Sequence, residues 1–175
     1  MTAISTAIPS LSLRHAEPSD AALILDFLKR LMTFQKLADE VTATAARIAA
    51  LIQNGKSEAV LALMNGEAVG CMVFSATASA YTGRAGLLLD AFFVDDRMRG
   101  QGVGRAMMAH LARLSIDRDG EMLEWGCLDW NQPAIAFYRG LGAYTLDEMR
   151  VYRLGPDRLA KLAAGASALL PPLFP

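Results

Sequence analysis

The chain has 175 residues, 53% of them hydrophobic, which fits one folded domain and excludes a globally disordered protein. Its 17 Lys and Arg residues and 18 Asp and Glu residues give a formal net charge of -1. We therefore expect no nucleic-acid partner, because proteins that bind nucleic acids usually carry an excess of basic residues. Two cysteines and two histidines are too few for a disulfide framework or a histidine-rich metal site, and no metal is expected.

The N-terminal third of the chain predicts a lead-in, a strand and two helices. Residues 1–10 are small and polar and lack a signal-peptide pattern, so we expect a flexible lead-in. Residues 11–14 alternate like a strand, a helix begins at residues 18–20, and a second helix covers residues 42–53. No apolar run reaches membrane-spanning length, so a cytoplasmic protein without a membrane partner is expected.

Strand patterns dominate the middle of the chain. Residues 59–64 and 68–74 are apolar runs joined by Asn65-Gly66, which is a strong signal for a β-hairpin. Residues 83–86 predict a turn. Residues 87–94 then form a nearly continuous apolar strand, which is typical of the middle of a sheet.

The remaining segments complete an α/β pattern of helices and strands. We expect a helix over 102–116, a strand over 122–128, a helix over 132–139, a closing hairpin from 143–145 and 149–154, and a short helix over 157–163. This order predicts one sheet with helices on both faces. The predicted domain covers residues 11–163, and an apolar tail covers residues 164–175.

A glycine-rich turn lies between the apolar strand and the next helix. Gly100, Gly102 and Gly104 let the main chain approach a ligand, and the free N–H groups of the turn and the helix start favour an anion such as a pyrophosphate. Arg99 and Arg105 would add charge-assisted contacts. A dinucleotide fingerprint needs Gly at position 105 and a P-loop ends in Gly-Lys-Ser/Thr, and neither is present. A turn that uses glycine for geometry alone stays open as the alternative.

Two motifs carry a resemblance to a known family. Arg99-Gly-Gln-Gly-Val-Gly104 resembles the R/Q-x-x-G-x-G/A acetyl-CoA motif of the GCN5-related N-acetyltransferases (GNAT). Asp129-Trp-Asn-Gln-Pro-Ala-Ile-Ala-Phe-Tyr138 resembles the W-N-x-P-x-x-x-F-Y segment of the diamine (spermidine/spermine) acetyltransferase branch. The likeness runs from about Leu11 to Leu162. It implies a GNAT-type α/β fold with a mixed, mostly antiparallel central sheet, and acetyl transfer from acetyl-CoA to an amine.

The resemblance also implies a set of coenzyme-binding residues. They lie at the end of the apolar strand, in the glycine turn and at the start of the last core helix. The predicted residues are Phe92, Phe93, Val94, Arg99, Gly100, Gln101, Gly102, Val103, Gly104, Arg105, Asn131 and Ala134. Asn131 is also a good N-cap for its helix, and both roles are compatible.

Two residues are candidates for proton transfer. The family uses the tyrosine of the second motif as an acid, which implies that Tyr138 protonates the departing thiolate; the alternative is a structural tyrosine whose hydroxyl bonds to the backbone. Asp90 is a candidate proton acceptor acting through water, and the alternative is a salt-bridged or partly exposed acid at a strand bulge. Cys127 is expected to be a buried core thiol, so we expect direct transfer in a ternary complex rather than an acetyl-enzyme.

The acceptor is expected to be a small molecule with a primary amine. Five acids are candidates for binding it: Asp39, Glu40, Asp90, Asp129 and Glu148. The chain has fewer acids than the branch it resembles, so a diamine, a lysine-like amino acid or an amino sugar fits as well as a polyamine. A protein or peptide acetyltransferase and a non-catalytic acyl-CoA-binding module are the alternatives. Analogy with the branch and the apolar tail favour a homodimer.

Overall fold

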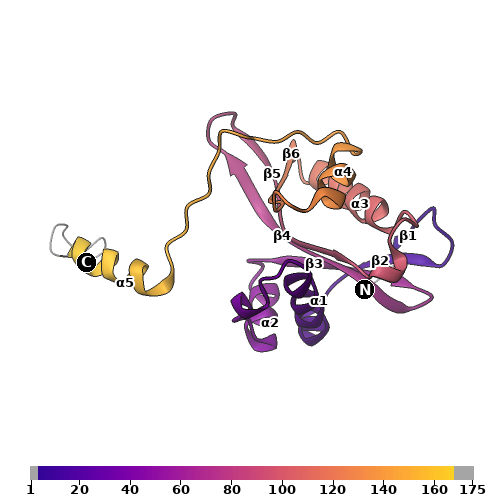
Figure 1. Cartoon of the computed structure of the whole chain (residues 1–175), viewed down its shortest axis with the longest axis horizontal. Coiled ribbons are helices and arrows are strands. Elements are labelled where there is room, and N and C mark those ends of the chain that lie inside the picture. Colours follow the sequence, from indigo (N-terminus) through magenta and orange to yellow (C-terminus); the bar gives the residue numbers. More distant parts are fainter. Residues whose placement is uncertain (1–3, 168–175) are drawn as a thin grey trace. The chain divides into compact units, whose positions relative to one another are not determined.

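The computed structural model describes residues 4–167, and contacts divide the chain into two units, Met1–Phe137 and Tyr138–Pro175. The described strands are β1 Ile4–Ser5, β2 Leu11–His15, β3 Glu58–Met64, β4 Glu67–Ser79, β5 Arg84–Val94 and β6 Met122–Trp125 (Figure 1). The described α-helices are α1 Ala21–Phe34, α2 Ala45–Gln53, α3 Val103–Asp117, α4 Gln132–Arg139 and α5 Pro156–Ser167. Short 3-10 turns are η1 Pro18–Asp20, η2 Ala38–Glu40 and η3 Asp96–Met98.

The strands form one mixed sheet in the order β1-β2-β3-β4-β5-β6. Neighbouring strands pair antiparallel except β5 and β6, which are parallel because α3 crosses over between them. The expected hairpin joins β3 to β4. Asn65 and Gly66 both have positive φ, at 52° and 84°, as a two-residue type I′ turn requires. The mixed, mostly antiparallel sheet is therefore confirmed.

Helices cover both faces of this sheet, as expected (Figure 1). On one face, Ile24 and Phe27 of α1 and Ile48 of α2 pack in a single buried cluster with Leu61 of β3 and Phe93 of β5. On the other face lies α3, which buries Val103, Met107, Met108 and Leu111. Burial of these apolar side chains provides the main stabilising free energy and fixes β5 between the two layers.

The β5–β6 pair begins at a glycine that the sequence placed in a turn. The turn actually covers residues 80–83, and Gly86 lies inside β5 opposite Met122. A Cβ atom at position 86 would collide with the carbonyl oxygen of Met122, so only glycine allows β6 to approach β5 this closely. The apolar strand therefore starts earlier than its apolar residues indicate.

Other differences concern the ends of the chain. Residues 4–5 of the expected lead-in pair with β2, and β6 ends at Trp125 rather than Leu128. The closing hairpin was predicted wrongly: within the described residues, 143–155 contain no strand, and the N–H of Met149 donates to the carbonyl of Leu146 in a turn. Val151 and Tyr152 are exposed, so the alternation of apolar residues there reflects no buried strand face. The predicted apolar tail lies largely outside the described residues.

Candidate functional site

The first feature of the site is the point where β5 and β6 separate. The parallel pairing joins Gly86–Leu89 to Met122–Trp125 and stops there, whereas β5 continues to Val94. Residues 90–94 of β5 therefore have no partner strand on that side among the described residues. Main-chain groups along such a stretch are free to bond an extended ligand.

Asp90 sits at this point for a local reason. On the β4 side, Phe74 pairs with Leu89 and Val73 pairs with Ala91, so Asp90 is the extra residue of a β-bulge. A bulge turns the following side chains to the opposite faces and is common beside active sites. Asp90 is exposed. The alternative that placed Asp90 at a strand bulge is therefore correct about the bulge. The exposed carboxylate can still be reached by a ligand from solution.

The bulge also sets the two aromatic residues that follow. Phe93 faces α1, with its ring centroid 5.6 Å from that of Phe27. Phe92 faces the other layer, where its ring stacks with Phe137 of α4 at 6.2 Å. The end of β5 is thereby held from both sides, which suits a strand whose main chain must stay in a fixed place.

The glycine turn follows the strand end directly. Gly100 and Gly102 adopt φ values of 74° and 84°, which glycine alone adopts without strain, and Gly102 is the N-cap of α3. The first N–H groups of α3 have no acceptor within the helix, and the helix dipole adds partial positive charge there. A Cβ at Gly100 would meet no atom of the described residues 4–167 within 4 Å. The turn therefore has a main-chain conformation compatible with an anion site, and anion binding there stays a prediction.

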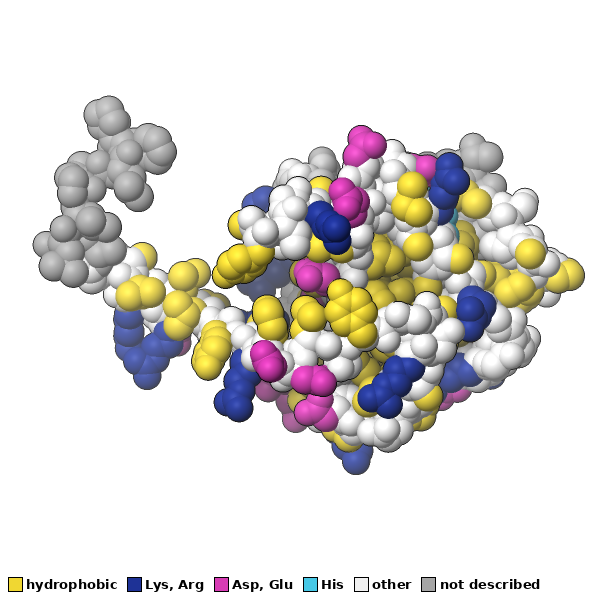
Figure 2. Space-filling model, turned by 90° about the horizontal axis from the view of Figure 1, so that it is seen from above, with side chains coloured by type: hydrophobic (Ala, Val, Ile, Leu, Met, Phe, Trp, Pro, Cys, Tyr) yellow, Lys and Arg dark blue, Asp and Glu magenta, His cyan; other side chains and the backbone are white. Residues whose placement is uncertain are grey.

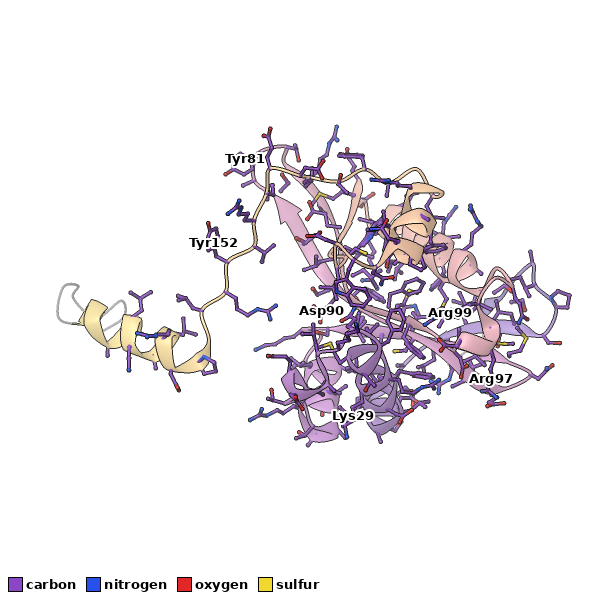
Figure 3. The ribbon with its side chains drawn as sticks, in the orientation of Figure 1. Lys29, Tyr81, Asp90, Arg97, Arg99 and Tyr152 are labelled. Atoms are coloured by element: carbon purple, nitrogen blue, oxygen red, sulfur yellow. The ribbon has the colours of Figure 1, made fainter. Side chains whose placement is uncertain are left out.

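The flanking arginine has protein partners in this structure. The Arg99 guanidinium forms an ion pair of 2.6 Å with Asp96 and lies 5.1 Å from the ring centroid of Phe34 (Figure 3). Both charged side chains are largely exposed, so the pair is weak and a phosphate can compete for Arg99. Gln101 donates its side-chain amide to the carbonyl of Arg97, which gives it a turn-stabilising role.

The second motif lies on the loop after β6 and on α4. Asn131 accepts the N–H of Ala134 at 3.3 Å, which is the expected N-cap bond. Trp130, which is half exposed, contacts Phe34 at the end of α1 with ring centroids 6.1 Å apart. Tyr138 lies on the last turn of α4 with a partly exposed side chain and is the first residue of the second unit.

The predicted acids are all exposed. Asp39 and Glu40 lie on η2 after α1, Asp129 lies on the loop after β6, and Glu148 belongs to the second unit. On the face seen in Figure 2, Lys and Arg side chains are interspersed with Asp and Glu side chains. Tyr81 lies at the β4–β5 turn, away from Asp90 (Figure 3). The role of these acids in acceptor binding stays a prediction.

Cys127 differs from its expectation. It was predicted as a buried core thiol, but β6 ends before it and the side chain is exposed in the following loop. The pKa of its thiol is raised, first by partial desolvation and then by the charge of Asp129. A raised pKa disfavours the thiolate, which is the nucleophilic form of cysteine. Direct transfer stays a prediction.

Sequence reasoning missed a buried carboxylate beside the strand end. Asp95 is 5% exposed and accepts hydrogen bonds from Arg30 of α1 and from Arg97 of η3. No local signal identifies Arg30 as its partner, because 65 positions separate the two residues. Within residues 4–167 we find no cluster of His, Cys, Asp and Glu suited to a metal ion, and no helix long and apolar enough to cross a membrane.

Comparisons with known proteins agree with this geometry. Residues 24–143 match the sequence profile of the family described as Acetyltransferase (GNAT) family. The chain is 30% identical over 149 residues to a thialysine N-epsilon-acetyltransferase of Sus scrofa, covering 79% of this chain and 87% of the relative. It is 25% identical to a human spermidine/spermine N(1)-acetyltransferase-like protein over 90% of this chain but only 24% of that protein.

The solved structures share the fold. An integron cassette protein from the mobile metagenome of V. cholerae superposes with a TM-score of 0.71 at 21% identity, covering 88% of this chain and 98% of that one. An identity this low supports the architecture alone.

Proposed function

We propose, because the chain belongs to the acetyltransferase (GNAT) family, that it transfers the acetyl group of acetyl-CoA to a primary amine of a small molecule such as a diamine, a polyamine or a lysine-like amino acid. Membership of the family implies an enzyme that uses acetyl-CoA. The observation that carries the proposal is the juxtaposition at β5 of three features: an exposed acid on a bulge, a strand end that has no partner strand on one side within the described part of the chain, and a glycine turn that leads into α3.

The chain's residues fit the coenzyme. The N–H groups at the start of α3 would bind its pyrophosphate, and the main chain of Phe92–Val94 would bond the amides of its pantetheine arm. The same strand end would hold the thioester carbonyl, whose oxygen gains negative charge during attack. The coenzyme supplies the activated acetyl group, and this chain's residues bind it, orient it and move protons.

The chemistry requires two proton transfers. An alkyl amine has a pKa near 10.4 and arrives protonated, so it must lose a proton before its nitrogen attacks the thioester carbon. We assign this proton to Asp90 through a water molecule, because the exposed carboxylate lies where β5 parts from β6. When the carbon–sulfur bond breaks, the thiolate takes a proton, and we assign Tyr138 as its donor.

A cationic acceptor requires a binding site with a moderate negative charge. We propose that Asp39, Glu40, Asp129 and Glu148 attract the cationic amine, with Asp90 nearest the reacting nitrogen. These carboxylates are exposed, so salt screens them within about 8 Å at physiological ionic strength. Acceptor KM should therefore rise with salt concentration while kcat stays constant.

Two measurements test the proposal. Thermal shift with acetyl-CoA tests coenzyme binding, and thiol release over a panel of diamines, polyamines, lysine-like amino acids and short peptides tests the acceptor. We expect Asp90→Asn to lower the rate and to flatten its rise with pH more than Glu148→Gln does. A fully active Asp90→Asn variant would show that solvent is the base. Activity confined to peptides would show that the protein is a peptide acetyltransferase.

We also propose a homodimer, by analogy with the diamine acetyltransferase branch. Light scattering at micromolar concentration measures the mass directly, and a monomeric mass refutes this part of the proposal.

A further inference from the structure

The carboxylate of Asp95 links the segment between β5 and the glycine turn to α1. The Oδ1 atom of Asp95 accepts the main-chain N–H of Arg97 at 3.1 Å and its Nε at 3.2 Å. The Oδ2 atom accepts Nη2 of Arg97 at 3.1 Å and Nη2 of Arg30 at 3.0 Å. The main-chain N–H of Asp95 donates to Val69 of β4 at 2.8 Å. The side chain of Asp95 thus joins α1 to η3, and its main chain joins both to the sheet.

α1 follows this segment along one stripe of its surface. Phe27, Arg30 and Phe34 are spaced by three and four residues, which places them on one side of the helix. The Arg30 guanidinium lies 4.8 Å from the ring centroid of Phe93, and Phe34 lies under the guanidinium of Arg99. The helix therefore contacts both the strand end proposed to hold the pantetheine arm and the turn proposed to hold the phosphates.

The chemistry of the group suits a fixed role. Arg97 and then Arg30 hold the pKa of Asp95 well below its usual range, so the carboxylate stays ionised at any physiological pH. Buried side-chain oxygens with several charge-assisted hydrogen bonds have few other orientations. The guanidinium groups of Arg97 and Arg30 are exposed enough to bond water instead of Asp95. The carboxylate of Asp95 is buried, so it depends on these two arginines.

We propose that Asp95 is a positioning residue for acetyl-CoA: through Arg30 and Arg97 it fixes residues 93–99 against α1 and so determines coenzyme affinity and the alignment of the thioester. This inference rests on the proposed function. It assigns to Asp95 no contact with the coenzyme or with the acceptor. Misplacement of a reactive group by about 1 Å can cost about 100-fold in rate, which sets the scale of the expected effect.

The test uses the full chain with Asp95→Asn and Arg30→Met. Asn keeps an oxygen for the N–H of Arg97 but loses the charge, and Met keeps the apolar stem of Arg30 but loses the guanidinium that lies over Phe93. Asp117→Asn is the matched control, because it removes the charge of an exposed Arg–Asp pair within α3. Calorimetry gives the acetyl-CoA Kd, steady-state kinetics give KM and kcat, and melting gives Tm.

We expect Asp95→Asn and Arg30→Met each to raise the Kd and KM for acetyl-CoA about tenfold and to lower kcat/KM by up to about 100-fold. The double variant should lose less than the sum of the two single changes, because both remove the shared Arg30–Asp95 pair. A merely structural role would lower the Tm of each variant and leave its KM for acetyl-CoA unchanged. If Asp95→Asn does not fold, Arg30→Met alone decides the question.

The outcomes separate the two levels of inference. Wild-type protein that binds acetyl-CoA, with variants that match Asp117→Asn in Kd and KM, overturns the role of Asp95 and leaves the proposed function standing. Wild-type protein that neither binds acetyl-CoA nor releases thiol overturns both.

Discussion

Two glycines of the coenzyme turn should respond in opposite ways to the same substitution. Gly102 has a φ of 84°, and alanine in such a left-handed conformation costs about 1–2 kcal/mol. Its new Cβ would also lie 3.1 Å from Cδ1 of Ile8, which must shift slightly. Gly104 lies within α3, and its Cβ would make ordinary 3.5 Å contacts with the rings of Phe92 and Phe137. Alanine there should gain up to about 1 kcal/mol of helix stability.

The assay is thermal melting with and without acetyl-CoA. For a protein of this size, about 1 kcal/mol shifts Tm by about 2–4 °C, so Gly102→Ala should lower Tm by about 2–8 °C and Gly104→Ala should hold or raise it. Acetyl-CoA at 100 times its Kd should add about 2.7 kcal/mol to wild type and to Gly104→Ala but much less to Gly102→Ala. Equal Tm and equal ligand shifts for Gly102→Ala and wild type would refute the assignment of the turn to the coenzyme.

Three further predictions concern single side chains. Tyr138→Phe should keep the affinity for acetyl-CoA and lose about 10²–10⁴-fold in kcat, and a rate within about twofold of wild type removes Tyr138 from the mechanism. Cys127→Ser should retain full thiol-release activity, whereas a stable acetylated Cys127 in mass spectra would contradict direct transfer. Burial and then the neighbouring His15 lower the pKa of His110, so the unfolded chain binds a proton at higher pH than the folded one. Stability should therefore fall as the pH drops below about 6.5, and a His110→Leu variant with the same Tm loss between pH 7 and pH 5.5 would show that another group is responsible.

Local signals predicted the elements that flank the site. The N-cap at Asn131 and the apolar spacing after it predict α4 over its observed range, and Asn65-Gly66 predicts the β3–β4 hairpin. Both depend on residues that are neighbours in the chain. The glycine turn was likewise found from its own residues and lies where expected, directly before α3.

Features that depend on pairing across the sheet were predicted only in part or not at all. A bulge at Asp90 was one of two open alternatives, because only the register of β4 shows which residue is extra. The early end of β6 leaves Cys127 exposed, although its neighbours in sequence are apolar. The bond between Arg30 and Asp95 joins distant segments, and no pattern along the chain reports it.

Within residues 4–167, β5 has no partner strand on one side beyond Leu89, which has a consequence for the solubility of the protein. A strand edge with unpaired main-chain groups can be extended by a strand of another molecule, which is a route to aggregation. Bulges and charged side chains are the usual protection, and Asp90 provides both at the position where this edge begins. A pantetheine arm bonded along the edge would cap it in the same way as a bound peptide strand. Neutralising Asp90 would therefore remove an aggregation gatekeeper together with the proposed base, and bound coenzyme should restore the solubility of such a variant.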